Sequence, residues 1–154
     1  ARSCQEAIID AIKGGGIDCW GHYSCSNATI NADAAIACYG TGSCHGAQLN
    51  ADRIFASGYY GAYGANINVQ SQLIASGYYS VSYSTIDTQQ DDENIGEVVD
   101  IKIRAHLSGN GATIICRNNC SLTCSLDGCL ELDYLCVDGA ECNVMPDDCS
   151  DGTK

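Results

Sequence analysis

Small and apolar residues recur along this chain with a period of 18 to 19 residues, visible when segments starting at Ile17, Ile36, Ile54 and Leu73 are aligned. In each segment they stand at the first and third positions, and again at the twelfth and fourteenth. Every segment also carries one glycine and one Asn or Asp at fixed positions. These are Gly21, Gly40, Gly58 and Gly77, followed by Asn31, Asn50, Asn68 and Asp87. A repeat this short predicts stacked coils that bury their apolar faces against one another.

The alternation within each coil predicts two short strands with inward apolar side chains, so the expected fold class is an all-β parallel β-solenoid. The recurring glycine is expected to adopt the positive φ of a tight turn, which a residue with a Cβ resists. The recurring Asn or Asp fits two interpretations. It is either a turn residue that tolerates the left-handed region, or a member of a column of side chains hydrogen-bonded from coil to coil.

The first 16 residues have a different pattern, which predicts a short helix that caps the first coil. Ser3 and Glu6 have the spacing of a capping box. Three consecutive glycines at positions 14–16 are expected to end the helix. Its apolar face is formed by Cys4, Ala7, Ile8, Ala11 and Ile12.

The 154 residues are expected to form a single domain. Coils are predicted over residues 17–115, with an acidic insertion at 88–100 that contains Asp91, Asp92 and Glu93. From Cys116 onward the period is lost, and seven cysteines lie among Asp- and Gly-rich turns. Residues 116–154 are therefore expected to form an irregular, disulfide-rich terminal section.

Twelve cysteines predict disulfides and a secreted or extracellular protein, since reducing compartments disfavour such bonds. Cysteines occur as Cys-x5-Cys pairs in the first two coils, and both members are replaced in the next two, which predicts a bridge within one coil. The same spacing recurs near the C-terminus. The predicted bridging residues are Cys19 with Cys25, Cys38 with Cys44, and Cys136 with Cys142.

The number of cysteines leaves two alternatives open. Five cysteines precede residue 45 and seven follow residue 115. Either one bridge joins the two groups, or pairing is local and one cysteine on each side is left for another chain. Cys4 and Cys149 are the candidates for this second case, which would link subunits head to tail.

The net charge of −12 argues against nucleic acid as a partner, because phosphate binding requires Lys and Arg. No stretch is long and apolar enough for a membrane span. The three histidines, His22, His45 and His106, lack metal-site or triad spacing, and no catalytic motif is present. We therefore expect neither an enzyme nor a cofactor. Oxygen-rich segments at 91–93 and 147–152 leave Ca²⁺ binding as an alternative to solvated acidic loops.

Tyrosines repeat one coil apart just after the turn glycine, at Tyr59, Tyr60, Tyr78 and Tyr79. They are expected either to form an exposed interface or glycan-binding platform, or merely to pack against each other over a thin core. Two sequons, beginning at Asn27 and Asn119, are candidate N-glycosylation sites. Asn27 lies at an outward position, whereas Asn119 precedes a cysteine.

The Cys-x5-Cys units, with their glycine and a following Ala-x-Ile-Asn, resemble the cysteine-rich β-solenoid repeats of proteins secreted by algae and other protists. The matching residues are Cys19, Gly21, Cys25, Ala28, Ile30 and Asn31, then Cys38, Gly40, Cys44, Ala47, Leu49 and Asn50, with a later unit at Cys136 to Cys142. The resemblance implies extracellular structural or adhesive use. We expect a secreted subunit of a filament or surface appendage that assembles head to tail; the alternative is a carbohydrate-binding module that uses the tyrosines.

Overall fold

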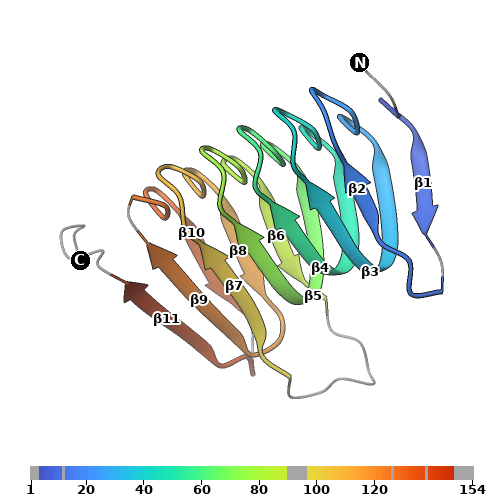
Figure 1. Cartoon of the computed structure of the whole chain (residues 1–154). Helices are drawn as coiled ribbons and strands as arrows, with labels where there is room; N and C mark the ends of the chain where they lie inside the picture. The colour runs from blue at the N-terminus through green and yellow to red at the C-terminus, as the bar shows by residue number, and fades with distance from the viewer. Residues whose placement is uncertain (1–3, 12, 90–96, 126, 138, 148–154) are drawn as a thin grey trace.

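The computed structural model describes residues 4–11, 13–89, 97–125, 127–137 and 139–147, and these residues form an all-β parallel solenoid without a helix. Each strand lies beside the equivalent strand of the next rung (Figure 1). The strands are β1 (Ile8–Ala11), β2 (Ile17–Cys19), β3 (Thr29–Cys38), β4 (Gln48–Ala56), β5 (Asn66–Ala75), β6 (Thr85–Thr88), β7 (Val99–Ile103), β8 (Thr113–Cys116), β9 (Cys120–Ser125), β10 (Asp133–Cys136) and β11 (Cys142–Asp147).

The strands form two parallel ladders on either side of a narrow core. The first ladder contains β1, β6, β8, β10 and the N-terminal halves of β3, β4 and β5. The second contains β2, β7, β9, β11 and the C-terminal halves of the same three strands. Among the described residues each ladder therefore has seven strands. The first ladder leads into the second at a short corner, and a long turn, such as 39–47 or 57–65, leads back.

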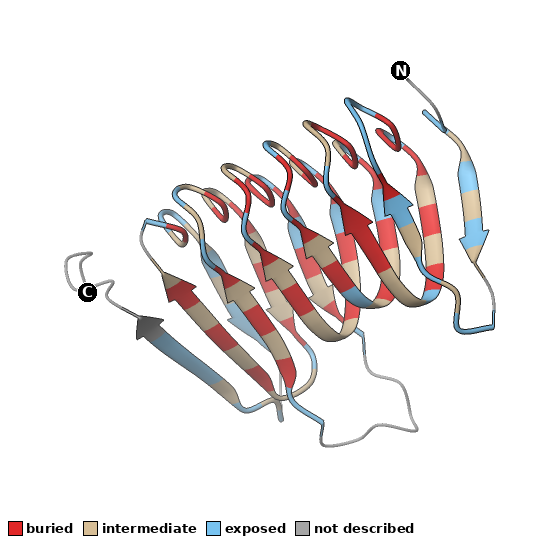
Figure 2. Ribbon diagram, viewed as in Figure 1, coloured by how far each residue is buried: buried red, intermediate tan, exposed pale blue. Residues whose placement is uncertain are grey.

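The core is built from the inward rows that the alternation predicts. In the second ladder, Ile36, Ile54, Leu73 and Ile101 are paired in register and none is exposed to solvent. Figure 2 shows the resulting alternation of buried and more exposed residues along the inner strands. Each such side chain contributes about 1.5–3 kcal/mol when it is fully buried. The stack of rungs, rather than any single rung, therefore supplies the hydrophobic stabilisation.

The predicted N-terminal helix is wrong over the described part of residues 1–16. Ile8–Ala11 form β1, in which Ile8 pairs with Thr29 of β3, and the backbone N–H of Glu6 donates to the carbonyl of Ser26 at 3.1 Å. The physical reason is the open edge of β3, whose backbone groups a strand satisfies and a helix does not. Ser3 of the capping box lies outside the described residues.

The glycine column exists, but the positive φ predicted for all four glycines holds for Gly21 alone. Only Gly21 has a positive φ, of 104°, whereas Gly40, Gly58 and Gly77 do not. A Cβ on Gly40 would lie 2.0 Å from the carbonyl oxygen of Gly21, and one on Gly58 would lie 2.1 Å from that of Gly40. Glycine is required here because successive backbones approach too closely for any side chain.

The recurring asparagines form a hydrogen-bonded column, and their interpretation as turn residues is wrong. Asn31, Asn50 and Asn68 lie in strands, and none has a positive φ. The amide of Asn31 donates to the carboxylate of Asp10 at 2.6 Å, and Asn50 donates to Asn31 at 2.6 Å. Asn68 in turn donates to Asn50 at 2.5 Å. The column fixes the register of the first four strands of the first ladder.

The section after residue 115 is more regular than predicted. Thr113 pairs with Asp133, and Cys120 pairs with Cys142, so the two ladders continue to residue 147. The acidic insertion ends before β7, since Val99 already pairs with Cys120. Residues 90–96 of the insertion and residues 148–154 lie outside the described part. The period is lengthened after residue 85, but the stacking is not interrupted.

Candidate functional site: the end rungs and the tyrosine edge

Three disulfides close long turns within single rungs. The structure joins Cys19 to Cys25 and Cys38 to Cys44, each with Cα atoms 5.9 Å apart. The third bond of this kind joins Cys124 to Cys129. All six residues belong to the core or pack against it. These bonds therefore both close the turn and fill the narrow interior beneath it.

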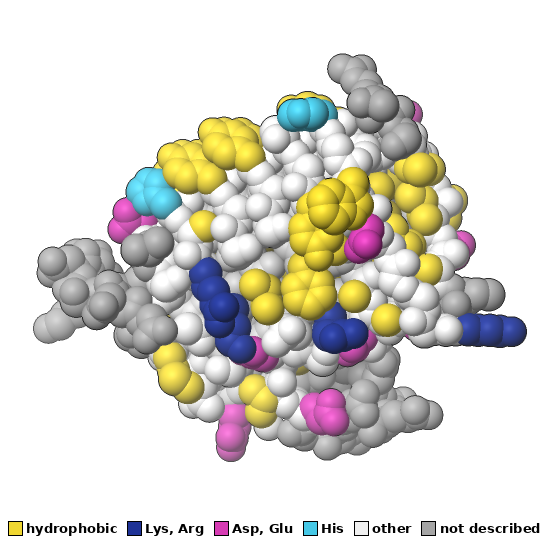
Figure 3. All heavy atoms as spheres, viewed as in Figure 1, with side chains coloured by type: hydrophobic (Ala, Val, Ile, Leu, Met, Phe, Trp, Pro, Cys, Tyr) yellow, Lys and Arg dark blue, Asp and Glu magenta, His cyan; other side chains and the backbone are white. Residues whose placement is uncertain are grey.

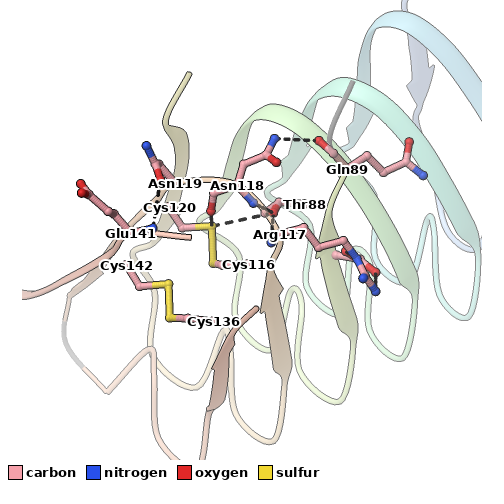
Figure 4. Close-up of a disulfide and its surroundings, with 11 residues drawn as sticks. Thr88, Gln89, Cys116, Arg117, Asn118, Asn119, Cys120, Cys136, Glu141 and Cys142 are labelled. Carbon is pink, nitrogen blue, oxygen red and sulfur yellow. Dashed lines mark hydrogen bonds and ion pairs between the residues drawn. A yellow bond between two sulfur atoms is a disulfide. The ribbon is translucent and has the colours of Figure 1, made fainter. Parts of the chain in front are cut away.

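The other two disulfides lie at the opposite, short corner. Cys136 is joined to Cys142, as the spacing predicted, but at the end of β10 rather than in a long turn. The bond between Cys116 and Cys120 stacks against it, because Cys116 pairs with Cys136 (Figure 4). The later Cys-x5-Cys unit is therefore not structurally equivalent to the first two. The spacing alone could not distinguish the two corners.

Cys4 is exposed and takes part in no disulfide among the described residues. Because Ile8 pairs with Thr29, Cys4 stands in the position that Cys25 occupies one rung later. The five bonds are local, as in the second of the two pairing alternatives. Cys149, the other candidate for a link between chains, lies outside the described residues.

Polar side chains form hydrogen bonds between neighbouring rungs at the short corner around the Cys116–Cys120 bond. Arg117 donates to both carboxylate oxygens of Asp87, at 2.7 and 2.9 Å, and this ion pair raises the pKa of Arg117. The amide oxygen of the sequon residue Asn119 accepts a hydrogen bond from the backbone N–H of Glu141 at 2.9 Å (Figure 4). The other sequon residue, Asn27, is exposed in a long turn and is thus more accessible to a glycan.

The predicted tyrosines are brought together along the edge formed by the long turns. Tyr59 stacks on Tyr78 with ring centroids 5.4 Å apart and an interplanar angle of 4°. Tyr60 stacks on Tyr79 at 5.3 Å and 8°. A third row contains His45 and three further tyrosines. Its neighbours in order are Tyr23, His45, Tyr63 and Tyr83.

Stacking limits what this edge can recognise. Each of the four predicted tyrosines presents one ring face to its partner in the next rung. Within one rung the two rings are nearly perpendicular, with centroids 4.5–4.6 Å apart. A hydrogen-bonding interaction with the Tyr59 phenol, followed by burial, raises the pKa of Tyr60. Burial, followed by the charge of the Tyr78 phenolate, raises the pKa of Tyr79. The faces between rungs are thus unavailable to a sugar ring. A glycan platform at Tyr59, Tyr60, Tyr78 and Tyr79 stays a prediction that would depend on the remaining ring surfaces and the hydroxyls.

A second aromatic cluster was missed from the sequence. Trp20 is 68% exposed, and its ring lies 4.7 Å from that of Tyr39. Phe55 is half-buried at an outward position of β4, and Arg53 lies on the same strand. Figure 3 shows hydrophobic side chains next to Lys and Arg side chains on this outer face of the second ladder. The available signal was that Trp20 and Tyr39 stand one period apart at an outward position.

The two ends of the solenoid are open among the described residues. β1 and β2 each pair with β3 alone, β10 pairs with β8 alone, and β11 pairs with β9 alone. Seven of the eleven large apolar side chains that are exposed belong to the first or last rung. They are Ile8, Trp20 and Tyr23 at one end, and Leu130, Leu135, Val144 and Met145 at the other.

The exposure of Val144 shows that the last rung is not covered by another strand in the described part of the chain. Val144 occupies the inward row of the second ladder, directly after Leu122, which is 2% exposed. Val144 is nevertheless 51% exposed, because no described strand lies beyond β11. At the other end of the same row Ile17 is only half-buried. A core row thus ends in an uncovered side chain at each end of the molecule.

The other chemistries considered concern the histidines, metal ions and a membrane span. His22 is exposed, and His45 stacks on Tyr63 with ring centroids 5.5 Å apart. The Nδ1 atom of His106 lies 2.8 Å from Oδ2 of Asp127. Within the described ranges no group of three or more His, Cys, Asp or Glu residues is arranged to hold a metal ion. The acidic segments considered for Ca²⁺ lie almost entirely outside those ranges. A search of the described residues found no helix with the length and hydropathy to cross a membrane.

Comparisons with protein-family models, with curated proteins and with solved structures found no match to this chain. Of the resemblance to secreted algal and protist repeats, the structure supports the fold alone, which is a disulfide-rich parallel solenoid. The five disulfides also indicate an oxidising environment.

Proposed function

We propose that this protein is a secreted structural subunit that assembles head to tail into an extracellular filament or surface appendage. The observation that carries the proposal is the match between the two ends. In the described part of the chain, each end has one strand of each ladder with a free edge, and the exposed large apolar side chains are concentrated there. Solenoids need their terminal rungs covered, and free strand edges pair readily with another chain.

In this proposal a second copy stacks on the open ends, and neither copy changes its fold. β10 belongs to the first ladder, as β1 does, and β11 belongs to the second, as β2 does. Stacking one copy on another would continue both ladders in the same parallel direction and cover Val144 with Ile17 of the next copy. Because the two surfaces differ, the contact is heterologous and propagates into a filament rather than closing as a dimer.

The structure suggests a sharp test with a matched control. Val144 and Val98 are both 51% exposed, but Val98 lies beside β7, away from both ends. In Val144→Asp, docking would bury an unpaired charge at a cost of about 3–5 kcal/mol, which weakens association by more than a hundredfold. Sedimentation velocity and electron microscopy are expected to show filaments for wild type and Val98→Asp, and monomers for Val144→Asp. The proposal fails if wild type stays monomeric at high concentration, or if both variants assemble alike.

A carbohydrate-binding module remains a second candidate, favoured by the exposed aromatic cluster rather than by the stacked tyrosines. Trp20 is the chain's one tryptophan, so its fluorescence reports directly on a bound sugar. Titration with soluble polysaccharides is expected to shift that emission if the cluster binds glycans, and Tyr39→Ala should weaken the response. An emission spectrum that no polysaccharide changes would remove this candidate.

A further inference from the structure

The stacked tyrosines place reactive phenols of successive rungs side by side. Tyr59 and Tyr78 are nearly parallel, with ring centroids 5.4 Å apart. Tyr59 is 47% exposed, so a soluble oxidant can reach one member of the pair. The two residues lie at equivalent positions of stacked turns, where Tyr60 N–H donates to the carbonyl of Tyr78 at 3.0 Å. The backbone therefore holds the two rings together before any reaction begins.

We propose that Tyr59 and Tyr78 form an oxidative cross-linking site, at which a secreted haem peroxidase and hydrogen peroxide join the two rings as dityrosine. Each phenol loses one electron and its phenolic proton. The two radicals then form one carbon–carbon bond between ring positions ortho to the oxygens. The two ortho hydrogens move to the oxygens and restore the phenols. Overall, two hydrogen atoms pass to the peroxide, which is reduced to two water molecules.

The position of the pair gives this cross-link a structural purpose. Tyr59 and Tyr78 lie in the two rungs that carry Ala56 with Ala62, and Ala75 with Val81, where the preceding two rungs have disulfides. A disulfide in this fold closes one long turn, whereas a link between Tyr59 and Tyr78 would join two rungs covalently. The cross-link would thus reinforce the part of the solenoid that no described disulfide holds. This requires a single chain only and does not depend on filament assembly.

The other tyrosines provide internal controls. Tyr39 is 41% exposed, much like Tyr59, but its ring lies against that of Trp20. Tyr23 lies beside His45. Tyr63 and Tyr83 are 5.4 Å apart but tilted by 56°, so their rings do not overlap in parallel. A variant at Tyr39 therefore removes an equally accessible phenol without removing a stacked pair.

The test is peroxidase treatment of dilute protein with hydrogen peroxide, followed by gel electrophoresis, dityrosine fluorescence and mass spectrometry. Wild type and Tyr39→Phe are expected to give a fluorescent monomer whose mass is lower by two hydrogens. Chymotryptic cleavage after Leu73 should leave the peptides of the two rungs joined. Because Tyr60 and Tyr79 form a second stacked pair at 5.3 Å, the variants are compared in a Tyr60→Phe background. There, adding Tyr59→Phe or Tyr78→Phe should lower the rate roughly tenfold or more, because partners held together have a high effective concentration. Phenylalanine keeps the ring, and circular dichroism checks that each variant is folded.

Unfolding provides the complementary control, since reduced wild-type protein in denaturant should lose the fast reaction as well. The proposal is overturned if fluorescence appears only in cross-linked dimers and larger species, or if adding Tyr59→Phe to Tyr60→Phe leaves the rate unchanged. Failure of the filament proposal would leave this result unchanged, because the reaction is followed in monomers.

Discussion

Adding a single Cβ atom at Gly58 tests whether the backbones of successive rungs lie in direct contact along the glycine column. A Cβ added to Gly58 would lie 2.1 Å from the carbonyl oxygen of Gly40 and 2.8 Å from its carbon. Both contacts are with backbone, which cannot swing aside as a side chain can. Gly64 is the matched control, because its φ is +64° but no atom lies within 4 Å of its added Cβ. At Gly58 an added Cβ is crowded but φ is not positive, whereas at Gly64 φ is positive and an added Cβ has open space.

The expected cost follows from these distances. Ordinary van der Waals contact of a Cβ begins at 3.4 Å, so Gly58→Ala requires two stacked rungs to separate by about 1 Å. The Gly58 N–H donates to the carbonyl of Cys38 at 3.1 Å, and that bond would lengthen too. We expect a loss of about 3 kcal/mol or more, at the upper end for overpacking. Gly64→Ala should cost about 1 kcal/mol, the penalty for an L-residue in the left-handed region.

Denaturant unfolding under non-reducing conditions, followed by far-ultraviolet circular dichroism, measures both changes. The expected order is wild type, then Gly64→Ala, then Gly58→Ala with the lowest free energy of unfolding. If Gly64→Ala were as destabilising as Gly58→Ala, backbone conformation rather than close approach would explain the glycines. The stacked-backbone reasoning would then be refuted.

Three further predictions concern the features that hold the rungs together. Asn50→Ala breaks two bonds of the amide column and should lower the free energy of unfolding by about 1–3 kcal/mol in the same assay. Replacing Cys38 by Ala together with Cys44 by Val should cost about 2 kcal/mol, the chain-entropy value for so short a loop, measured as a lower denaturation midpoint. Because the folded-state pKa values of Tyr60 and Tyr79 are raised, stability should be unaffected below about pH 10 and fall as pH rises above it. Alkaline titration of phenolate absorbance, compared with the double Phe variant, checks this sign.

The inward rows of the solenoid could be predicted because alternation is local information. The strands that contain Ile36, Ile54 and Leu73 can be predicted from the neighbouring residues in the sequence, without reference to a pairing strand. The first rung could not be predicted in this way, since the apolar spacing around Ile8 fits a helix as well as a strand. The free edge of β3, remote in sequence, decides between them.

Contacts between rungs explain the other differences. The sequence shows that Gly58 recurs but not that it faces the backbone of Gly40 across a rung. The coils after residue 115 were not predicted from the sequence because the period changes, although the stacking continues and Thr113 pairs with Thr85. The four tyrosines were found from their repeat, but whether their faces were free or stacked depends on the spacing between rungs. Trp20 was missed because it has only one aromatic counterpart in the following coils.

Cryo-electron microscopy of the assembled protein tests the end-to-end account most directly. Seven strands per ladder at a spacing of about 4.8 Å predict an axial rise of about 34 Å per subunit, with a continuous strand repeat along the filament. The reconstruction should place β10 beside β1 and β11 beside β2 of the next copy. Isolated monomers, or filaments whose subunits touch through their sides and leave these four edges free, would contradict it.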